Sequence, residues 1–400
     1  MAVGLFGGHA ACSQKRLSPE KRFAERGRAL PSGGTVAEAL TTDYRLARES
    51  DLKAFVAAAL LEVGVAKPDA EIVAEVLVTA DLRGVESHGV ARLESYYISR
   101  IKNGLLEPTP TVTTVMETPT SLVVDAGNGL GHPTAKRTME AIMAKAKTSG
   151  AAFGGVRNSN HYGIAGYYAM LALDHGLIGV ASTNSVRYGA PTYGRDMLLG
   201  TNPLAFAVPA KNEPAFVLDF ATTTVPRGKL EVYGRKEKNL NPGWATDEHG
   251  VETIDPKVAL KGALLPLGGL GIDNGGHKGY GLGLLVDILC GVLTGGKFGS
   301  DLPLLSEGPK PGGISHWFAA FRIDGFRDLE RFKADMDTEL RAFKDSAKAP
   351  GHDRIYVAGE IEHEKTEFNR KNGVPIHVKI WDGLEKMAST LGIPFAIEKT

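Results

Sequence analysis

Cysteine is scarce in this chain of 400 residues, which holds only Cys12 and Cys290. Two thiols cannot build a disulfide framework or a four-thiolate zinc site, and their scarcity favours a reducing compartment. No apolar run approaches the roughly 18 residues that indicate a transmembrane helix. No charge sign is in excess, since 46 Lys and Arg balance 46 Asp and Glu. The sequence therefore offers no large basic field for nucleic acid or an anionic membrane.

Several well-known site motifs are missing too. The chain has neither the G-x-G-x-x-G of a standard Rossmann dehydrogenase nor a Walker loop for nucleotide phosphates. It has no H-E-x-x-H and no Cys/His cluster at metal-ligand spacing, so a metal-dependent hydrolase is disfavoured and no metal is expected. Glycine is abundant, at 49 of 400 residues. This is nearly double the usual share of about 7%, and it favours tight turns and close backbone approaches, as in many nucleotide-binding enzymes.

Residues 1–40 differ in composition from the rest of the chain. They hold six Lys and Arg against three Glu and show no sustained apolar period, which favours a disordered extension or a start codon placed too far upstream. A mitochondrial transit peptide is the alternative, weakened by the acidic residues Glu20 and Glu25. We therefore expect a cytoplasmic protein, with a mitochondrial location as the alternative.

From Ser50 onward the apolar pattern is regular. It predicts three helices, from Ser50 as N-cap to Gly64, from Pro68 to about Gly84, and over about 88–102. Strands and helices then alternate, with strands predicted at residues 121–125, 152–156, 178–183, 204–208 and 215–220. A buried helix is predicted over 280–293 and a charged amphipathic helix over 329–344. The alternation predicts a sheet-rich α/β core beside an N-terminal helical unit.

The segment Glu86-Ser87-His88-Gly89-Val90-Ala91-Arg92 is the first candidate site. If Ser87 caps the third helix, His88 lies in its first turn and Arg92 lies four residues on, over the same face. A helix N-terminus with an arginine fork beside it suits a carboxylate, and His88 could donate to the substrate or relay a proton. On spacing alone, a capping serine and a solvated arginine remain the simpler interpretation.

The second candidate is Asn158-Ser159-Asn160-His161-Tyr162-Gly163, which lies between a predicted strand and a predicted helix. Ligands commonly bind at this edge of an α/β sheet. His161 could remove the proton from a substrate hydroxyl there, because the unperturbed pKa of histidine lies near neutrality. A hydrogen-bonded loop histidine is the alternative that the local sequence leaves open.

Two predicted strands end in polar residues. Asp219 closes one of them and is followed by Thr222-Thr223-Thr224, which suits a ribose contact or an orienting partner for a histidine. An aspartate in a turn, with threonines as caps, explains the same pattern. Ser182-Thr183-Asn184-Ser185 ends another strand and offers polar groups of the same kind.

The last candidate is Gly275-Gly276-His277-Lys278-Gly279-Tyr280-Gly281, just before a predicted helix. Glycines in this place let backbone amides approach a phosphate, and Lys278 adds a positive charge. The spacing is not that of a Walker loop, because no Ser or Thr follows the lysine.

Taken in this order, these segments resemble the malate/L-lactate dehydrogenase family, NAD(P)-dependent oxidoreductases that lack a Rossmann fold. The family also includes ureidoglycolate, sulfolactate and cyclic-imine carboxylate enzymes. The matching phrases are Ala80-Asp81-Leu82-Arg83-Gly84, Ser87-His88-Gly89-Val90-Ala91-Arg92-Leu93, Ser159-Asn160-His161-Tyr162-Gly163, Gly200-Thr201-Asn202-Pro203, Leu218-Asp219-Phe220-Ala221-Thr222, Pro242-Gly243-Trp244-Ala245 and Gly275-Gly276-His277-Lys278-Gly279-Tyr280-Gly281. The resemblance covers about Tyr44 to Pro394, nearly the whole chain.

The resemblance implies a mixed α/β fold of the malate/L-sulfolactate dehydrogenase type, with a flanking helical domain. The cofactor-binding and catalytic core would span residues 116–327, and residues 44–115 plus 328–400 would form the helical domain. Members are similar in forming intertwined homodimers with the active site near the subunit boundary. We therefore expect a homodimer that takes a small carboxylate substrate and has no nucleic-acid or membrane partner.

The resemblance also implies roles for single residues. His161 matches the proton acceptor, Ser87 and His88 match a relay or proton donor of some members, and Arg92 matches the carboxylate-binding position. The positions that match cofactor contacts are Ser185, Asp219, Phe220, Ala221 and Lys278. The cofactor would be NAD, with NADP as the alternative.

The implied reaction is hydride transfer between NAD(P) and a small 2-hydroxy or 2-oxo acid, with malate and oxaloacetate expected ahead of L-lactate. Such a reaction needs a base on the hydroxyl and a cation on the carboxylate, which His161 and Arg92 supply; His161 is favoured over His88 as the base. Hydride chemistry belongs to the cofactor, so no metal is required.

Two alternatives stand beside this function. Within the family, the enzyme would be a ureidoglycolate dehydrogenase or a cyclic-imine carboxylate reductase, which the sequence alone does not distinguish. Outside it, a non-catalytic nucleotide-binding protein is disfavoured, because such a relic would be expected to have lost at least one of His88, Arg92, His161 and Asp219.

Overall fold

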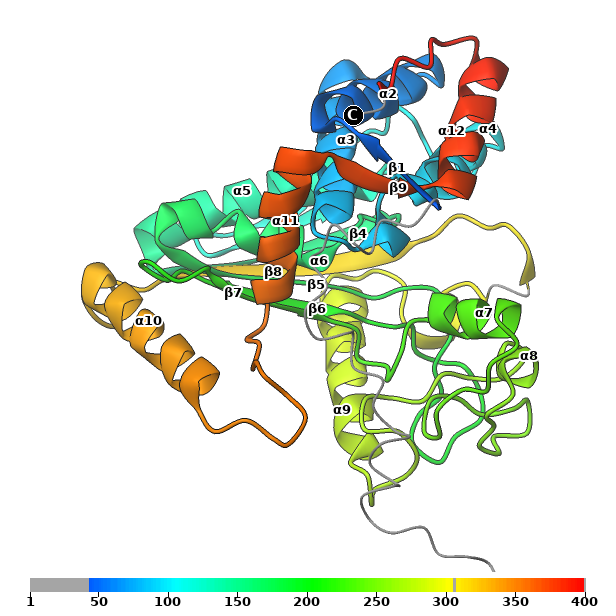
Figure 1. The fold of residues 1–400 in the computed structure, drawn as a ribbon. Coiled ribbons are helices and arrows are strands. Elements are labelled where there is room, and N and C mark those ends of the chain that lie inside the picture. Colours follow the sequence, from blue (N-terminus) through cyan, green and yellow to red (C-terminus); the bar gives the residue numbers. More distant parts are fainter. Residues whose placement is uncertain (1–42, 305–306, 399–400) are drawn as a thin grey trace, which may run out of the picture. The chain divides into compact units, whose positions relative to one another are not determined.

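The computed structural model of the protein describes residues 43–304 and 307–398 (Figure 1). The chain divides into two units, Met1–Tyr44 and Arg45–Thr400. The expectations for residues 1–40, a disordered extension or a transit peptide, lie outside the described residues. The elements below belong to the second unit, apart from Tyr44 at the start of the first strand.

A seven-stranded mixed sheet forms the centre of the second unit. Its strands lie in the order β2-β3-β4-β8-β5-β6-β7. Their bounds are Thr113–Glu117 (β2), Ser121–Asp125 (β3), Ala151–Ser159 (β4), Leu177–Thr183 (β5), Leu204–Val208 (β6), Phe216–Phe220 (β7) and Ile314–Arg322 (β8). Strands β3 and β4 pair in parallel, and all other neighbours in the sheet are antiparallel. The predicted mixed α/β fold is confirmed.

The central strand, β8, is absent from the sequence-based prediction. It pairs with β4 along one edge and with β5 along the other, so it joins the two halves of the sheet. Its sequence, ISHWFAAFR, is a short and mostly apolar run. Periodicity alone cannot assign such a run to a strand or to a buried helix segment.

Helices cover both faces of the sheet. Consecutive residues of a strand point to opposite faces, and Gly154 and Gly155 of β4 show what covers each. A Cβ on Gly154 would meet Ile142 of α5 (Gly131–Ser149), whereas a Cβ on Gly155 would meet Thr294, beyond α9 (Gly276–Asp287). Figure 1 shows α5 and α6 (Ala165–Met170) above the sheet and α9 below it.

Elements from both ends of the described chain share one hydrophobic cluster. The contributing helices are α2 (Glu49–Glu62), α3 (Lys67–Leu82), α4 (Ser99–Lys102) and α12 (Val378–Leu391), with β1 (Tyr44–Ala47) and its pairing partner β9 (Val374–His377). Helix α11 (Glu360–Asn372) joins through Asn369, whose amide donates to the Leu82 carbonyl at 2.8 Å. These blue and red elements lie together on one side of the sheet in Figure 1.

We propose that this cluster is the core of the helical domain expected from residues 44–115 plus 328–400. Helix α10 (Leu329–Asp345) contributes no side chain to the cluster. Instead, Asp337 of α10 accepts hydrogen bonds from the backbone N–H groups of Lys211 and Asn212, at 2.9 and 3.1 Å. These contacts tie α10 to the loop between β6 and β7. A separate small cluster gathers around α7 (Arg227–Arg235) and α8 (Pro256–Ala259).

Three local predictions need correction. Ser50 does not cap α2, since that helix begins at Glu49 after Arg48 and the Ser50 hydroxyl donates to Asp51. Residues 88–102 do not form one helix: Glu86–His88 and Val90–Arg92 are 3₁₀ turns, Leu93–Ile98 is a π turn, and only α4 is α-helical. The break lies at Gly89, which is extended, because the next backbone N–H, of Val90, donates to the Asp81 carboxyl group instead of a helical carbonyl.

The third correction concerns the helix predicted to be buried over 280–293. Helix α9 begins at Gly276 and continues into a π turn at Ile288–Val292. Many apolar side chains along it are partly exposed in the single chain. These are Leu284, Leu285, Ile288, Val292 and Leu293, with exposed fractions of 38–63%.

Candidate active site

His161 lies just after β4, where the chain leaves the sheet before α6. Its Nδ1 lies 2.6 Å from the Tyr97 hydroxyl oxygen and 3.3 Å from the backbone nitrogen of Gly163, whose N–H it accepts in the tautomer that carries the proton on Nε2. Its ring stacks on that of His88, with centroids 5.5 Å apart, and meets the Tyr96 ring edge-on at 5.1 Å. The predicted pair, His161 and His88, is therefore in contact.

The protein around His161 disfavours its charged form. Burial is the main cause that holds the pKa of His161 well below its usual value, and His88, His132 and Arg92 lower it further. The pKa of His88 falls to about 4 for the same principal reason, with Arg92 adding to the effect. Both imidazoles are thus neutral near pH 7, so each retains a nitrogen able to accept a proton.

The segment from Ser87 to Arg92 is folded back on itself. The Ser87 hydroxyl lies 2.9 Å from Nδ1 of His88, and Nε of Arg92 donates to the Ser87 carbonyl at 2.5 Å. The Arg92 guanidinium also lies over the Tyr96 ring, 4.8 Å from its centroid. The sequence suggested that Ser87 caps a helix. In the structure its hydroxyl instead contacts the ring of His88.

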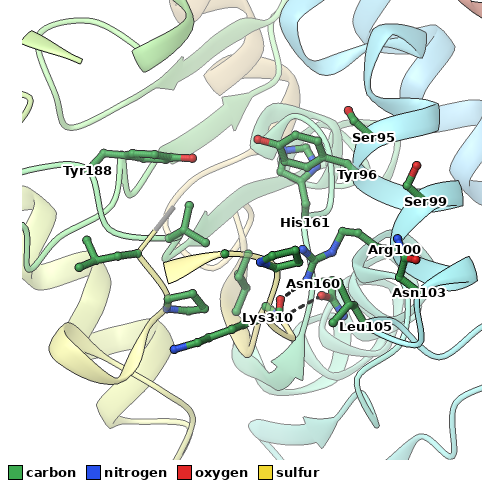
Figure 2. A pocket seen from close by; sticks show the side chains of 17 residues that line it. Ser95, Tyr96, Ser99, Arg100, Asn103, Leu105, Asn160, His161, Tyr188 and Lys310 are labelled. Carbon is green, nitrogen blue, oxygen red and sulfur yellow. Dashed lines mark hydrogen bonds between the residues drawn. The ribbon is translucent and has the colours of Figure 1, made fainter. Parts of the chain in front are cut away.

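A cavity of about 440 Å³ opens beside His161 (Figure 2). We name it the Arg100 cavity. Its polar lining comes from the helical segment after Arg92, from the end of β4 and from two later loops: Ser95, Tyr96, Ser99, Arg100, Asn103, Asn160, His161, Tyr188 and Lys310. Among the residues that the structure describes, no acidic side chain lines it. The rest of the lining is apolar, from Leu105, Val186, Pro303, Leu304, Pro309 and Ile314, so the cavity combines apolar walls with the two cations Arg100 and Lys310.

A second cavity, of about 520 Å³, lies on the other side of the histidine pair. We name it the Asp219 cavity; it is lined by Ser87, His88 and Asp219 together with Phe220 and Ala221. Asp219 accepts from the Gly166 N–H of α6 at 2.7 Å, and removal from bulk water raises its pKa to about 6. His88 lines this cavity and stacks on His161, which lines the other. The two cavities therefore meet at the His88–His161 pair.

Three of the predicted site residues line neither of these two cavities. The Arg92 guanidinium lies over the Tyr96 ring, outside both cavities. The Ser185 hydroxyl accepts from the Thr201 N–H at 3.1 Å, so it supports a residue of the Asp219 cavity without lining it. Lys278 is exposed in the first turn of α9.

Four residues that lie at the site were not predicted from the sequence. Arg100, Tyr97, Tyr188 and His132 belong to no motif of the resemblance. The hydroxyl oxygen of the buried Tyr97 lies 3.3 Å from Nε2 of His132, which is itself fully buried. For Tyr97 the sequence holds one signal: it recurs with Leu93 and Ile101 at a spacing of four residues, which indicates a buried face. A tyrosine buried there needs a hydrogen-bond partner for its hydroxyl.

No group of three or more His, Cys, Asp or Glu side chains among the described residues could hold a metal ion. None of the helices that the structure describes is long and apolar enough to cross a membrane.

Comparison with known proteins identifies the family. Residues 47–385 match the family model described as malate/L-lactate dehydrogenase. The chain is 44% identical to a malate dehydrogenase of Pyrococcus horikoshii over 86% of this chain and 94% of that protein. It is 37% identical to an L-sulfolactate dehydrogenase of Methanocaldococcus jannaschii over 84% of this chain and 94% of that one.

A solved structure shares the fold. The crystal structure of malate dehydrogenase from Entamoeba histolytica superposes with a TM-score of 0.83 and 36% identity, covering 88% of this chain and 99% of that one. The sequence resemblance and the expected fold type are therefore both confirmed. The chain belongs to the malate/L-lactate dehydrogenase family, and it is a dehydrogenase that acts on hydroxy acids.

Proposed function

We propose that this enzyme transfers a hydride between NAD(P) and a small 2-hydroxy or 2-oxo acid, with malate and oxaloacetate as the pair ahead of L-lactate and pyruvate. The observation that carries the proposal is the neutral His161 at the junction of two cavities, one for each reactant. The relatives named malate dehydrogenase, at 44% and 42% identity, support the order of substrates.

Ureidoglycolate is the second candidate substrate. A relative from Escherichia coli named ureidoglycolate dehydrogenase (NAD(+)) is 32% identical over 79% of this chain. A cyclic-imine carboxylate is a weaker alternative, because the reductase structure of that type is 24% identical and shares the fold alone.

The Asp219 cavity fits a nicotinamide nucleotide. Its volume of about 520 Å³ lies within the range of small-molecule sites, and it combines apolar walls with the carboxyl groups of Asp219 and Glu362 and the guanidinium of Arg83. Asp219 would accept hydrogen bonds from ribose hydroxyls, and Phe220 and Ala221 would pack against the nucleotide. When bound, NAD(P) supplies the site of hydride exchange. Ser185 would act through Thr201, and a contact from the exposed Lys278 would require a second subunit.

His161 would serve as the base. It lines the Arg100 cavity, whereas Nδ1 of His88 is engaged by Ser87. With its Nδ1 turned toward Tyr97, His161 keeps Nε2 for the substrate hydroxyl and would take its proton as the hydride leaves the same carbon. Ser87 and His88 would relay that proton. Arg92 lines neither cavity, so it would bind the substrate carboxylate once its guanidinium leaves the Tyr96 ring. Such a positioned acid/base typically contributes about 10²- to 10⁴-fold in rate.

A homodimer completes the proposal. The exposed apolar side chains of α9 and the turn after it, from Leu284 to Leu293, form a continuous stretch of a kind that marks interaction sites in soluble proteins. A second copy of the chain would cover this stretch. A cytoplasmic location also stays part of the proposal, on the scarcity of cysteine.

The deciding experiment follows the absorbance of NADH and of NADPH with oxaloacetate, pyruvate and a cyclic-imine carboxylic acid, for the wild type and for His161→Ala. We expect turnover of oxaloacetate above pyruvate and its loss in the variant. Turnover of the imine alone would move the enzyme to the alternative substrate class. An unimpaired variant would mean that His161 is not the base.

A further inference from the structure

The Arg100 cavity holds a cation that has no anionic partner. Arg100 extends from α4 into the cavity, and its Nη2 donates to the backbone carbonyl of Lys310 at 2.7 Å (Figure 2). No carboxylate among the described residues forms an ion pair with it. The other cation of the cavity, Lys310, is already paired, since its Nζ lies 2.9 Å from a carboxylate oxygen of Glu307.

Partial burial adds a cost to this unpaired charge. Desolvation is the main cause that lowers the pKa of the Arg100 guanidinium. A partly desolvated cation without a counter-ion is unfavourable, and an anion that enters the cavity would remove that cost. A planar guanidinium with free N–H groups is also suited to hold a carboxylate or a sulfonate through two hydrogen bonds.

Arg100 is separate from the arginine assigned to the reacting end of the substrate. Arg92 lies over the Tyr96 ring and donates to Ser87, beside the histidine pair. Arg100 and His161 instead line one shared cavity of about 440 Å³, a volume large enough for a complete small ligand. A substrate at His161 therefore has room to extend toward Arg100.

We propose that Arg100 forms a subsite for a second acidic group of the substrate, so that the enzyme selects 2-hydroxy acids that carry a distal carboxylate or sulfonate over lactate. This inference rests on the proposed function. The inference goes beyond the proposed function because it assigns the selection among hydroxy acids to one residue, Arg100, which lies outside the motifs of the family resemblance.

The test compares Arg100→Met with the wild type on L-malate and on its 4-methyl ester, in which the distal acid is neutral. We expect kcat/KM for L-malate to fall about 10- to 100-fold in the variant, the usual worth of a hydrogen-bonded charge pair. The ester should change by less than about 3-fold, because the interaction is already absent from it. L-Sulfolactate in place of L-malate shows which of the two acidic groups fits better.

Two variants act as controls. Lys102→Met removes an exposed cation from the same helix and should leave both substrates unaffected. Arg100→Lys keeps the charge but loses the planar fork, so it should recover part of the activity on L-malate only. Equal losses on L-malate and the ester would overturn the proposal, since Arg100 would then bind the carboxylate at the reacting end. Unchanged kinetics on both would overturn it as well.

A binding measurement separates this inference from the proposed reaction. Succinate carries two carboxylates and no hydroxyl, and butyrate is its one-carboxylate counterpart. We expect succinate to raise the melting temperature of the wild type more than butyrate does, and Arg100→Met to abolish the difference. If no hydroxy acid is turned over but this difference is found, the proposed function fails and the subsite stands. If turnover is found and the two acids stabilise both proteins equally, the subsite fails alone.

Discussion

The hydroxyl oxygen of Tyr97 lies 2.6 Å from Nδ1 of His161 and 3.3 Å from Nε2 of His132. One buried hydroxyl thus touches two imidazoles, and the first of them is the proposed base. If Nδ1–H of His161 donates to Tyr97, the Tyr97 hydroxyl can donate to His132, and Nε2 of His161 keeps its lone pair for the substrate. When Nε2 carries the proton instead, the hydroxyl can turn and donate to Nδ1. Tyr97 is therefore suited to both directions of the reaction.

Tyr97→Phe removes this hydroxyl and little else. We expect kcat to fall about 5-fold, because a hydrogen bond that orients the base is typically worth about 1 kcal/mol. The KM of the hydroxy acid should change little, since Tyr97 does not line the Arg100 cavity. Steady-state kinetics in both directions provide the measurement. His132→Gln is the matched control, because its amide can still bond Tyr97; a loss as large as that of Tyr97→Phe would contradict the proposed role of the hydroxyl.

The buried histidines predict how stability depends on pH. His132 and His316 are fully buried, and burial lowers the pKa of each to about 3. In the unfolded chain both histidines titrate near pH 6.5. Between about pH 6.5 and 3 the unfolded chain therefore binds more protons than the folded protein, and the stability of the fold decreases as the pH is lowered. Each such group contributes at most about 1.4 kcal/mol per pH unit.

Two carboxyls oppose this trend. Burial raises the pKa of Asp81 to about 8 and that of Asp219 to about 6, so each favours folding as the pH falls through its own window. The lowered pKa values of His88 and His161 act in the same direction as those of His132 and His316. The histidines therefore outweigh the two carboxyls, and the protein loses stability as the pH is lowered below 6.5. Urea unfolding at pH 7.0, 6.0 and 5.0 tests this. His132→Gln should flatten the dependence, whereas substitution of the exposed His352 should not; equal slopes for the two variants would refute the assignment.

The sequence predicted that His161 lies between a strand and a helix, and this placement is confirmed. The predicted strand and helix on either side of it exist, and the residue between them lies at the edge of the sheet. The four-residue spacing of Leu93, Tyr97 and Ile101 indicates an apolar face in the sequence, and all three residues are buried. Arg100 could not be found in this way. The break at Gly89 and the π turn after it change the direction of each side chain, and the wall opposite Arg100 comes from residues more than two hundred positions later.

The missing central strand limited the prediction in the same way. Without β8, the sequence does not show that His316 packs face to face on Tyr162, with ring centroids 4.3 Å apart, directly beside the proposed base. His316 also bonds Thr183 and Ser159, which lie on two other strands. These contacts depend on strand order, and periodicity along the chain carries no information on strand order.

Gly89 and Asp81 fix the segment that carries His88 and Arg92. The buried Asp81 carboxyl accepts from the Val90 N–H at 2.8 Å, and a Cβ on Gly89 would overlap this carboxyl. We expect Gly89→Ala to cost about 1–3 kcal/mol of stability and to lower activity, since the whole turn must move. Asp81→Asn should be mild at pH 7, because the raised pKa keeps the native carboxyl protonated and the amide matches its shape. Urea unfolding and kinetics test both; a tolerated alanine would mean that the turn is not held in this way.

The exposed apolar stretch of α9 gives the last prediction. Leu285 and Leu293 are 47% and 63% exposed in the single chain, and a second copy of the chain is proposed to cover them. We expect the wild type to sediment as a dimer and Leu293→Asp to dissociate it, because a charge in an apolar interface loses its hydration without gaining a partner. Phe326→Asp is the matched control, since Phe326 is 85% exposed and lies far along the chain from α9. If Lys278 reaches the cofactor of a second subunit, the monomeric variant should also bind NAD(P) more weakly. A monomeric wild type, or a dimer that Leu293→Asp leaves intact, would show that this stretch is not the subunit interface.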